Sequence, residues 1–427
     1  RVTRLVRDTR LARIIHLVET AQASRAPVQS FVDRFARWYT PAVIVFAVAI
    51  ALVPVVSATA DATTWFYRAL VLLVIACPCA LVISTPVSVV SALSAAARNG
   101  VLIKGGAYLE RLAGVRVVAF DKTGTLTKGE LQVTDVVPAG PLSAREILRL
   151  AAAVESRSEH LVARAIVQRA GADGLDVPRV AAFASIPGMG AQAEVDGHRV
   201  IVGNARMLSE RQVTSSVDPG GPLPALAGNG RSMVFVVVEG SIAGMIALAD
   251  RPREAARDTV ERLREHGIRH VAMLTGDHPD AARAIAADVG VDEHYAALTP
   301  DQKHACVRQL RAAHGPVLMV GDGVNDAPAL AAADVGVAMG AAGSDAALET
   351  ADVALMSDEL LKLPYAVRLA RATLRNIKMN VTISLALKAA FLVLAVTGSA
   401  TLWMAVLADT GASVIVVGNA LRLLRAR

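Results

Sequence analysis

Long uncharged stretches lie near the two ends of the chain, and a region of shorter, mixed segments lies between them. Residues 41–60 carry no charge and have about the length, roughly 20 residues, of a helix that crosses a bilayer. Residues 69–97 are also uncharged, and two further apolar runs follow Lys378, at roughly 379–397 and 400–421. This pattern predicts four membrane-spanning helices, two on each side of the central region.

The central region, from about 98 to 378, alternates short β-rich runs with amphipathic helices, which is typical of an α/β protein. One pattern occurs three times, an apolar strand that ends in polar Gly and Asp residues: VRVVAFDKTGTLT (115–127), VAMLTGD (271–277) and PVLMVGDGVND (316–326). Strand ends of this kind belong to one doubly wound sheet, whose crevice lies at the carboxyl ends of the strands. Residues 130–247 contain strands of their own and are expected to form a separate inserted lobe.

The composition supports a membrane protein. Hydrophobic residues make up 54% of the 427 residues and the mean hydropathy is +0.45, which is too apolar for an ordinary soluble protein. The net charge is only +6, and the basic segments RFARW, AARNG, RATLRNIK and RLLRAR adjoin the apolar runs. This placement follows the positive-inside rule, puts the central region in the cytoplasm and does not favour nucleic-acid binding.

Two cysteines flank a proline inside the second apolar stretch, in ACPCALVIS (76–84). A proline within a helix frees a backbone carbonyl one turn earlier and opens the helix, so Cys77 and Cys79 are expected to face a cavity instead of lipid. A CxC pair is too close for a comfortable bridge, which favours metal or redox chemistry. Thiolates select soft ions such as Cu(I) and Zn²⁺, whereas the plain alternative for either cysteine is apolar packing.

One charged residue interrupts each of the last two apolar runs: Lys388 in NVTISLALKAAFLVL and Asp409 in VLADTGASVIV. Charges inside a membrane are costly and face protein or a cavity, although a snorkelling lysine or a structural ion pair is the alternative. Two thiolates and one aspartate would balance the charge of Zn²⁺ and of the Lys388 ammonium, and zinc accepts mixed sulfur and oxygen ligands. Without an ion, Lys388 can pair with Asp409. Cu(I) would leave surplus negative charge, and Met404 has no Met-Ser pattern near Asp409.

Asp121 follows an apolar strand and precedes Lys-Thr-Gly-Thr. A carboxylate in this place can act as a nucleophile on a γ-phosphoryl group and form an aspartyl-phosphate. A single aspartate after a strand is more often a helix N-cap. The complete string DKTGTLT, followed in order by TGD and GDGVNDAPAL, favours phosphorylation.

The other strand ends supply the remaining groups that phosphoryl transfer needs, which are positioning and charge neutralisation. Mg²⁺ is expected to bind Asp121, the carbonyl of Thr123 and Asp322. Thr275 and the N–H of Gly276 can bind phosphoryl oxygens, and Lys303 can neutralise the developing charge. The remaining members of the predicted catalytic set are Lys122, Asp277, Asn325 and Asp326, of which the last two would hold the metal and its loop.

These motifs identify the chain as similar to a known family. DKTGTLT, MLTGD and GDGVNDAPAL resemble the phosphorylation domain of a P-type ATPase, which has a haloacid-dehalogenase-like fold. With CPC in the preceding span, the chain resembles the heavy-metal branch. The intramembrane lysine and the D-x-G at Asp409–Gly411 resemble the Zn²⁺, Cd²⁺ and Pb²⁺ exporters. The resemblance implies ATP and Mg²⁺ as cofactors, Asp121 as the phosphorylated residue, and a multi-pass protein of the bacterial plasma membrane.

The resemblance also implies that the inserted lobe binds the nucleotide. Heavy-metal members use a Ser-x-His-Pro motif and a Gly-x-Gly turn for adenine and phosphates. Here SEHL supplies Glu159 and His160, with Leu161 where proline is usual. The turns IPGMG and VGN supply the other expected contacts, Gly188, Gly190, Gly203 and Asn204. By itself a Gly-x-Gly is weak evidence and most often a tight turn.

The resemblance covers only the C-terminal part of such a pump, because no actuator Thr-Gly-Glu loop or earlier spans are found. The expected order is a linker helix from that missing domain (1–40), two spans with CPC (41–98), the first part of the phosphorylation domain (99–129), the nucleotide-binding domain (130–247), the rest of the phosphorylation domain (248–375) and two spans (376–427). This polypeptide alone is expected to bind ATP and to turn over poorly.

Three alternatives stay open. They are a membrane-anchored haloacid-dehalogenase-type phosphatase, a Cu(I) pump, and a metal-binding membrane fragment without enzyme activity. In the first case Cys77, Cys79, Lys388 and Asp409 would be dispensable. Cys306, the third cysteine, is expected to pack inside a helix and has no assigned role.

Overall fold

The computed structural model describes residues 27–54, 62–77, 79–158, 160–186, 188–210, 232–322, 326–340, 349–396 and 399–425. The chain divides into two compact units. The first consists of residues 1–118, 261–269 and 304–427, and the second of residues 119–260 and 270–303.

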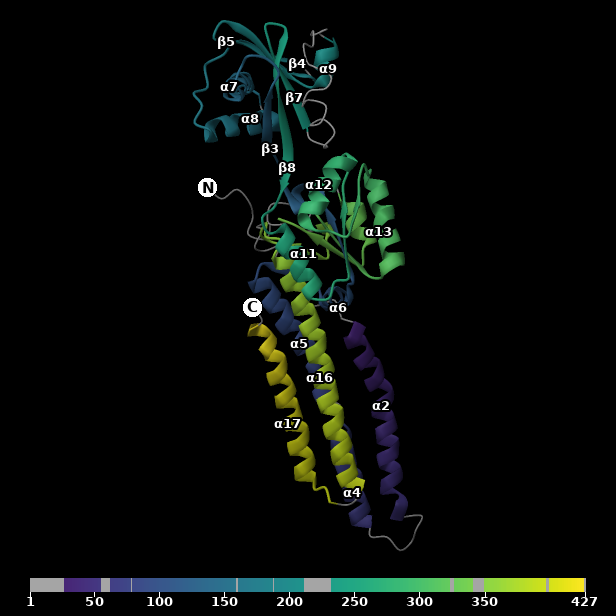
Figure 1. Ribbon diagram of the computed structural model, residues 1–427. Coiled ribbons are helices and arrows are strands. Elements are labelled where there is room, and N and C mark those ends of the chain that lie inside the picture. Colours follow the sequence, from purple (N-terminus) through teal and green to yellow (C-terminus); the bar gives the residue numbers. More distant parts are fainter. Residues whose placement is uncertain are drawn as a thin grey trace, which may run out of the picture. The chain divides into compact units, whose positions relative to one another are not determined.

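A bundle of long apolar helices belongs to the first unit, and these helices run side by side (Figure 1). They are α2 (Pro27–Ala51), α4 (Ala62–Ala76), α5 (Cys79–Arg98), α16 (Lys362–Val396) and α17 (Leu402–Leu421). Many of their large apolar side chains point outward, for example Trp403 at 80% and Leu407 at 70% exposure. Such apolar surfaces suit hydrocarbon better than water. The helices also satisfy their own backbone polar groups, as a membrane-spanning segment must.

Three stretches of this bundle are long and apolar enough to cross a membrane: Ala62–Arg98, Lys362–Ala395 and Leu402–Arg425. They correspond to the second, third and fourth predicted spans. The first predicted span lies in a shorter apolar helical stretch, Arg37–Ala51, and residues 55–61 lie outside the described part.

Two helices extend past the predicted boundaries. Helix α2 already begins at Pro27, so the described end of the predicted linker is continuous with the first apolar helix. Helix α16 is a single helix of 35 residues that starts at Lys362, ahead of the boundary set at 376. Its first turns are amphipathic and its later turns apolar, and no helix-breaking residue separates them.

The predicted phosphorylation domain contains a seven-stranded sheet with the order β1-β13-β12-β11-β2-β9-β10. Its strands are β1 (Val101–Ile103), β2 (Val117–Asp121), β9 (His270–Leu274), β10 (Glu293–Tyr295), β11 (Val317–Gly321), β12 (Val335–Ala338) and β13 (Val353–Leu355). Strands β11, β12 and β13 are parallel, as are β9 and β10, whereas the edge strand β1 is antiparallel. Continuous apolar runs such as VVAF and VLMV are completely buried, which is typical of a doubly wound sheet and confirms the predicted fold class.

The helices of this part follow the strands in alternation. They are α6 (Gly106–Gly114), α11 (Ala256–Glu265), α12 (Pro279–Val289), α13 (Pro300–His314) and α14 (Ala327–Ala332). Cys306 is buried in α13, as predicted, and burial raises the pKa of its thiol. A thiol of raised pKa is a poor nucleophile and metal ligand, so Cys306 is a packing residue.

The inserted lobe is a six-stranded antiparallel sheet in the second unit, with the order β3-β8-β7-β6-β5-β4. Its elements are β3 (Thr127–Pro138), α7 (Ala144–Glu155), α8 (Leu161–Ala172), β4 (Ala181–Ile186), β5 (Gly190–Val195), β6 (His198–Gly203), α9 (Ala205–Glu210), β7 (Ser232–Val238) and β8 (Ser241–Pro252). Helix α7 begins at an N-cap, because Ser143 Oγ accepts a hydrogen bond from the N–H of Glu146. Apolar residues of α7, α8 and the sheet, Ile147 and Ile246 among them, form one core.

Candidate functional site

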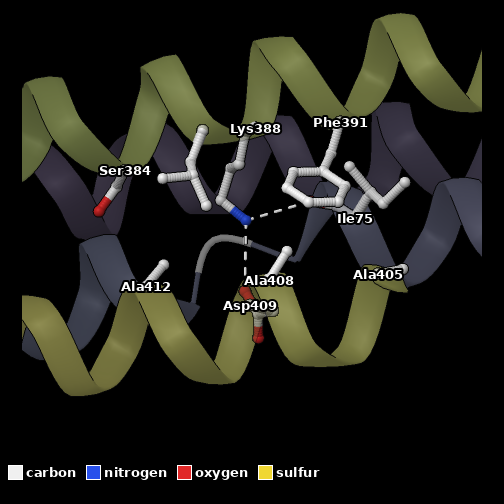
Figure 2. Close-up of a pocket in the computed structure, with 9 residues that line it drawn as sticks. Ile75, Ser384, Lys388, Phe391, Ala405, Ala408, Asp409 and Ala412 are labelled. Carbon is white, nitrogen blue, oxygen red and sulfur yellow. Dashed lines mark hydrogen bonds and ion pairs between the residues drawn. The ribbon is translucent and has the colours of Figure 1, made fainter. Parts of the chain in front are cut away.

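The first candidate site lies inside the helix bundle, where the side chains of Lys388 and Asp409 meet (Figure 2). Lys388 comes from α16 and Asp409 from α17, and Nζ lies 3.5 Å from Oδ1. The two side chains are only 17% and 22% exposed. The predicted pairing of these residues is therefore confirmed, and it agrees with the rule that charges within a membrane face protein or a cavity.

The Lys388 ammonium also contacts the interrupted helix. It donates hydrogen bonds to the backbone carbonyls of Ile75, at 3.1 Å, and of Cys77, at short range. Helix α4 ends at Ala76 and α5 begins at Cys79, so these carbonyls lie where the helix is broken, as the CPC sequence predicts. One ammonium thus joins the break to the carboxylate of Asp409.

The two cysteines differ from the prediction. The structure joins Cys77 and Cys79 in a disulfide, so the prediction that a CxC spacing disfavours a bridge is wrong. The Cα–Cα distance of 5.6 Å lies within the ordinary disulfide range. A disulfide offers no thiolate, so the predicted metal ligands exist only after reduction.

A small cavity of about 20 Å³ lies at the Lys388–Asp409 pair. Its lining comes from α4, α16 and α17 and includes Ile75, Ser384, Phe391 and Ala412. Neither cysteine is among the lining residues, and Cys77 reaches this place by its backbone carbonyl. Of the four predicted transport residues, the structure therefore brings Lys388, Asp409 and the main chain of Cys77 together.

The second candidate site surrounds Asp121, the last residue of the buried strand β2. Lys303, in the first turn of α13, places Nζ 2.5 Å from Asp121 Oδ1. The side chains are 13% and 6% exposed, so this is a largely buried ion pair. A lysine in this place balances the negative charge of Asp121 and would meet the oxygens of a phosphoryl group that is transferred to it.

Lys122 occupies a different place from Lys303. Its Nζ lies 2.5 Å from Asp277 Oδ2 and 3.5 Å from Asp250 Oδ2, and its side chain is 6% exposed. Asp277 in turn donates its backbone N–H to the Oγ1 of the buried Thr275. Lys122 therefore ties the turn after β2 to the turn after β9. Asp250 was missed by sequence reasoning, although it is an aspartate at the end of an apolar run, MIALA, within β8.

The turn of residues 122–126 is held by Arg253, which sequence reasoning also missed. Its guanidinium donates to the carbonyls of Thr125, at 2.8 Å, and Gly124, at 3.2 Å. Thr123 is exposed and its backbone is extended, with φ −76° and ψ +127°. The predicted phosphoryl-binding Gly276 follows Thr275 and is exposed.

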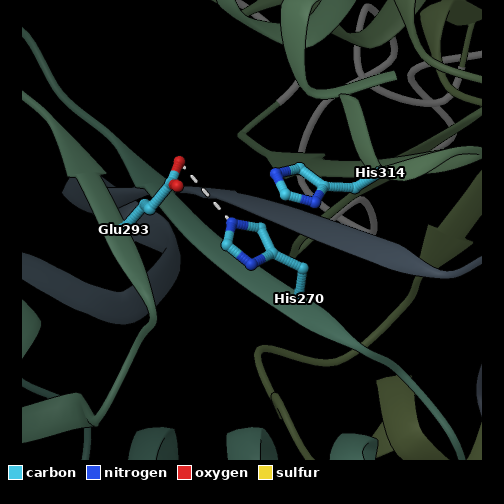
Figure 3. A group of neighbouring side chains, drawn as sticks. All are labelled: His270, Glu293 and His314. Atoms are coloured by element: carbon cyan, nitrogen blue, oxygen red, sulfur yellow. Dashed lines mark ion pairs between the residues drawn. The ribbon is translucent and has the colours of Figure 1, made fainter. Parts of the chain in front are cut away.

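The edge of the sheet next to β9 is fixed by side chains of β10 (Figure 3). His270 Nε2 lies 3.6 Å from Glu293 Oε2, and the Tyr295 hydroxyl donates to the same oxygen at 2.7 Å. The N–H of Thr275 donates to the Tyr295 carbonyl. Strand β10 thereby positions the end of β9, where Thr275 and Asp277 lie.

Asp322 and Asp326, the predicted Mg²⁺ and loop residues, follow β11 in the first unit. Asp322 is half-buried and Asp326 is 2% exposed. Asp326 packs against Gly321, where any Cβ would come within 2.7 Å of Asp326 Oδ2, so that glycine is required for the close approach. Asn325 lies outside the described residues.

The third candidate site is a cavity of about 270 Å³ in the inserted lobe. This volume is near the lower end for small-molecule sites, which measure roughly 300–1,000 Å³. Predicted nucleotide residues that line it are His160, Gly188, Gly190, Gly203 and Asn204. Glu159 lies outside the described residues.

The glycine turn of this cavity has a steric reason. A Cβ on Gly190, whose φ is +148°, would overlap the carbonyl of Val202. Asn204 closes the same turn, because its Nδ2 donates to the Gly188 carbonyl at 3.0 Å and its N–H donates to the Met189 carbonyl at 2.9 Å. Asn204 therefore shapes the rim of the cavity by holding its backbone.

Glu155 is a lining residue that sequence reasoning did not select. It is 6% exposed, and burial raises the pKa of its carboxyl, partly offset by a hydrogen bond from Ser158. A buried carboxyl beside an open cavity can accept hydrogen bonds from a ligand amino group. Its signal in the sequence was a single charge at the end of the apolar run LAAAVE, five residues before His160.

Leu161 occupies a position that suits proline. His160 is the N-cap of α8, with Nδ1 accepting from the N–H of Val162, and Leu161 is the first residue of the helix. Its side chain is 57% exposed. Because the N–H at this position has no partner within the helix, leucine and proline both fit there.

Comparisons with known proteins identify the family of the chain. Residues 115–334 match the family model of the haloacid dehalogenase-like hydrolases. The chain is 46% identical over 432 residues to a probable cadmium-transporting ATPase of Staphylococcus aureus (strain MRSA252), covering 100% of this chain and 59% of that protein. It is 48% identical over 415 residues to the zinc/cadmium/lead-transporting P-type ATPase of Escherichia coli (strain K12), covering 97% of this chain and 55% of that protein.

A solved structure shows the same similarity. The crystal structure of a zinc-transporting PIB-type ATPase in the E2.Pi state superposes with a TM-score of 0.83 at 46% identity, covering 99% of this chain and 69% of that one. The chain thus spans somewhat more than half the length of the two curated relatives, at 59% and 55%.

Proposed function

The chain belongs to the heavy-metal-transporting P-type ATPases, and from this membership we propose that it serves ATP-driven export of Zn²⁺, Cd²⁺ or Pb²⁺ through an aspartyl-phosphate on Asp121. The observation that carries the proposal is the Lys388 ammonium, held at once by the Cys77 carbonyl at the helix break and by Asp409. The three relatives named above are described as cadmium-, zinc/cadmium/lead- and zinc-transporting ATPases.

ATP is proposed to bind in the cavity of the inserted lobe. The glycine turn at Gly188 and Gly190 lets a ligand approach the backbone closely. His160 and the buried carboxyl of Glu155 supply side-chain contacts, and Glu155 is suited to accept from the amino group of adenine. Glu159 and Asn204 complete the proposed nucleotide contacts, the latter through the backbone that it holds.

Phosphoryl transfer is proposed to start with attack of an Asp121 oxygen on the γ-phosphorus of ATP. The bond between that phosphorus and the bridging oxygen breaks, and ADP leaves with the electron pair. Lys303 then lies beside the new phosphoryl group and balances its charge. Thr275, Gly276 and Asp277 close the same end of the sheet, where Lys122 holds Asp277 in place.

Mg²⁺ fits the donors that the strand ends offer, since it prefers oxygen ligands from carboxylates and carbonyls. Asp121, the Thr123 carbonyl and Asp322 would hold it, with Asn325 and Asp326 supporting the loop. When bound, the ion would neutralise charge on the phosphates.

The transported ion is proposed to bind the thiolates of reduced Cys77 and Cys79 together with Asp409. Two thiolates and one carboxylate bring three negative charges, which balance a dication and the ammonium of Lys388. The ammonium therefore makes the occupied site neutral and competes for Asp409, which favours release. The expected location is the bacterial plasma membrane, with the nucleotide lobe in the cytoplasm.

The test is metal-dependent phosphorylation of the chain in membranes, with radiolabelled ATP and Zn²⁺, Cd²⁺, Pb²⁺, Cu⁺ or Co²⁺ under reducing conditions. We expect label on Asp121 that responds to the first three ions and disappears in Asp121→Asn. Asp409→Ala should abolish the response to metal while ATP binding persists. Best stimulation by Cu⁺, with Asp409→Ala silent, would overturn the proposed cargo.

A further inference from the structure

We propose that Ser384 is a positioning residue of the transport site, whose hydroxyl receives the Lys388 ammonium when a metal ion takes Asp409. The inference rests on the proposed function and adds to it a place for the displaced ammonium. It follows from the burial of Ser384, from its unpaired oxygen and from its place between two cavities.

Ser384 lies on α16 four residues before Lys388, so both side chains leave the same face of the helix. Figure 2 shows the two side chains projecting from α16 toward α17. Ser384 is 1% exposed, and its Oγ has no hydrogen-bond partner among the described residues. A buried hydroxyl without a partner is unusual, because its desolvation is not offset.

The polar residues that precede Ser384 on this face are satisfied. Asn380 Nδ2 donates to Asn376 Oδ1 at 3.1 Å, and Asn419 of α17 donates to Asn380 Oδ1 at 2.7 Å. Ser88 of α5 donates to Asn376 Oδ1 at 3.1 Å. These contacts fix the three helices at one level. Ser384 lies one turn closer to Lys388 and makes no such contact, so its hydroxyl is available to a group that moves.

The Lys388 ammonium is such a group. Its present acceptors are the carbonyls of Ile75 and Cys77 and the carboxylate of Asp409. A dication bound to Asp409 would repel the ammonium at this distance and take the carboxylate acceptor from it, so a further acceptor within the bundle would stabilise the displaced ammonium.

A second cavity offers the space. It has a volume of about 200 Å³ and lies among α2, α4, α5 and α16, and Lys388, Ile75 and Ser384 line it as they line the first cavity. The other lining residues are apolar except Tyr39. The side chain of a helical lysine leans toward the preceding turn, where Ser384 lies. A serine oxygen accepts from an ammonium, and Ser384 is the polar lining residue on the same helix, one turn before Lys388.

The experiment measures the equilibrium affinity for Zn²⁺ of the reduced full chain in detergent. The variants are Ser384→Ala, Lys388→Met and the double variant. Ser384→Ala removes no existing hydrogen bond and should fold. It should weaken Zn²⁺ binding about tenfold, as expected for one lost bond to a charged group. In the Lys388→Met background the same change should alter the affinity by less than about twofold, because no ammonium needs an acceptor.

Two controls accompany these variants. Ser384→Thr keeps a hydroxyl and should restore most of the affinity. Thr382→Ala removes an exposed hydroxyl of the same helix that donates to its own backbone at Lys378, and should leave the affinity unchanged.

Three outcomes overturn the inference. The first is that Ser384→Ala leaves the affinity for Zn²⁺ unchanged. The second is that it weakens the affinity equally in the Lys388→Met background. The third is that Ser384→Thr fails to restore the affinity. The second outcome would make Ser384 a direct ligand of the ion. Failure of the unmodified reduced chain to bind Zn²⁺, or binding that survives loss of both thiols, would instead overturn the proposed function.

Discussion

The ammonium of Lys303 lies 2.5 Å from the carboxylate of Asp121, at the buried end of β2. A buried pair of this kind balances the negative charge of the attacking carboxylate and places a positive charge beside the incoming phosphoryl group. The transfer step then depends on Lys303 more than the binding of ATP does.

Replacement of Lys303 by methionine should therefore lower the rate of phosphoenzyme formation about 10²-fold or more, as for other single groups that stabilise a transition-state charge. ATP affinity should change little, because the nucleotide cavity is lined by other residues. The measurement is rapid-quench phosphorylation with radiolabelled ATP. Lys128→Met is the matched control, because Lys128 is an exposed lysine just after the turn of residues 122–126. An equal loss in both variants would contradict the assigned role.

Glu155→Gln should stabilise the inserted lobe and weaken its ligand binding. Burial raises the pKa of Glu155 above its ordinary value of 4.5, so the folded lobe binds this proton more tightly than the unfolded chain does. Stability is therefore lost as the pH rises from that ordinary value through the raised pKa. The glutamine variant should gain amide protection in α7 relative to the parent at about pH 8, and gain little at about pH 4.

The same substitution should weaken ATP binding about tenfold, because a charged acceptor is replaced by a neutral one. Hydrogen exchange at both pH values and equilibrium nucleotide binding measure the two effects. A variant that is less stable at the higher pH, or that binds ATP as tightly as the parent, would contradict a ligand-binding carboxyl at this place.

Leu161→Pro should preserve ATP affinity and leave α8 intact. Leu161 is the first residue of α8, its side chain is exposed, and proline suits this position. Val162→Pro is the informative comparison, because the N–H of Val162 donates to His160 Nδ1 and would be lost. If Leu161→Pro weakened nucleotide binding as strongly as Val162→Pro, the structural account of this position would fail.

Reduction should switch on metal binding. The disulfide between Cys77 and Cys79 leaves no thiolate, so the oxidised chain should bind no Zn²⁺ at this place, and the reduced chain one ion. Cys306→Ser should behave like the parent, because that thiol is buried in α13. Equal binding by the oxidised and reduced chains, measured by atomic absorption after gel filtration, would argue against a thiolate site.

Features that depend on local sequence could be predicted. The sheet, the break at CPC and the approach of Lys388 to Asp409 follow from apolar strands that end in aspartate and from charges that must avoid lipid. The limits of α2 and α16 could not, because α16 continues from polar into apolar sequence without a breaking residue and α2 continues through Pro41.

Features that depend on tertiary contacts were missed. Glu155, Asp250, Arg253 and Ser384 acquire their importance from burial or from partners distant in sequence, as Arg253 does from the carbonyls of Gly124 and Thr125. The Cys77–Cys79 disulfide could not be predicted, because the spacing of the two cysteines gives no information on the backbone conformation at Cys77.

The central claim is a single metal site made by the two thiolates and Asp409. X-ray absorption at the zinc edge of the reduced, zinc-loaded chain tests it most directly. We predict two sulfur neighbours at about 2.3 Å with oxygen or nitrogen neighbours at about 2.0–2.2 Å, and a loss of oxygen scattering in Asp409→Ala. A spectrum without sulfur neighbours, or one that is unchanged in Asp409→Ala, would contradict the claim.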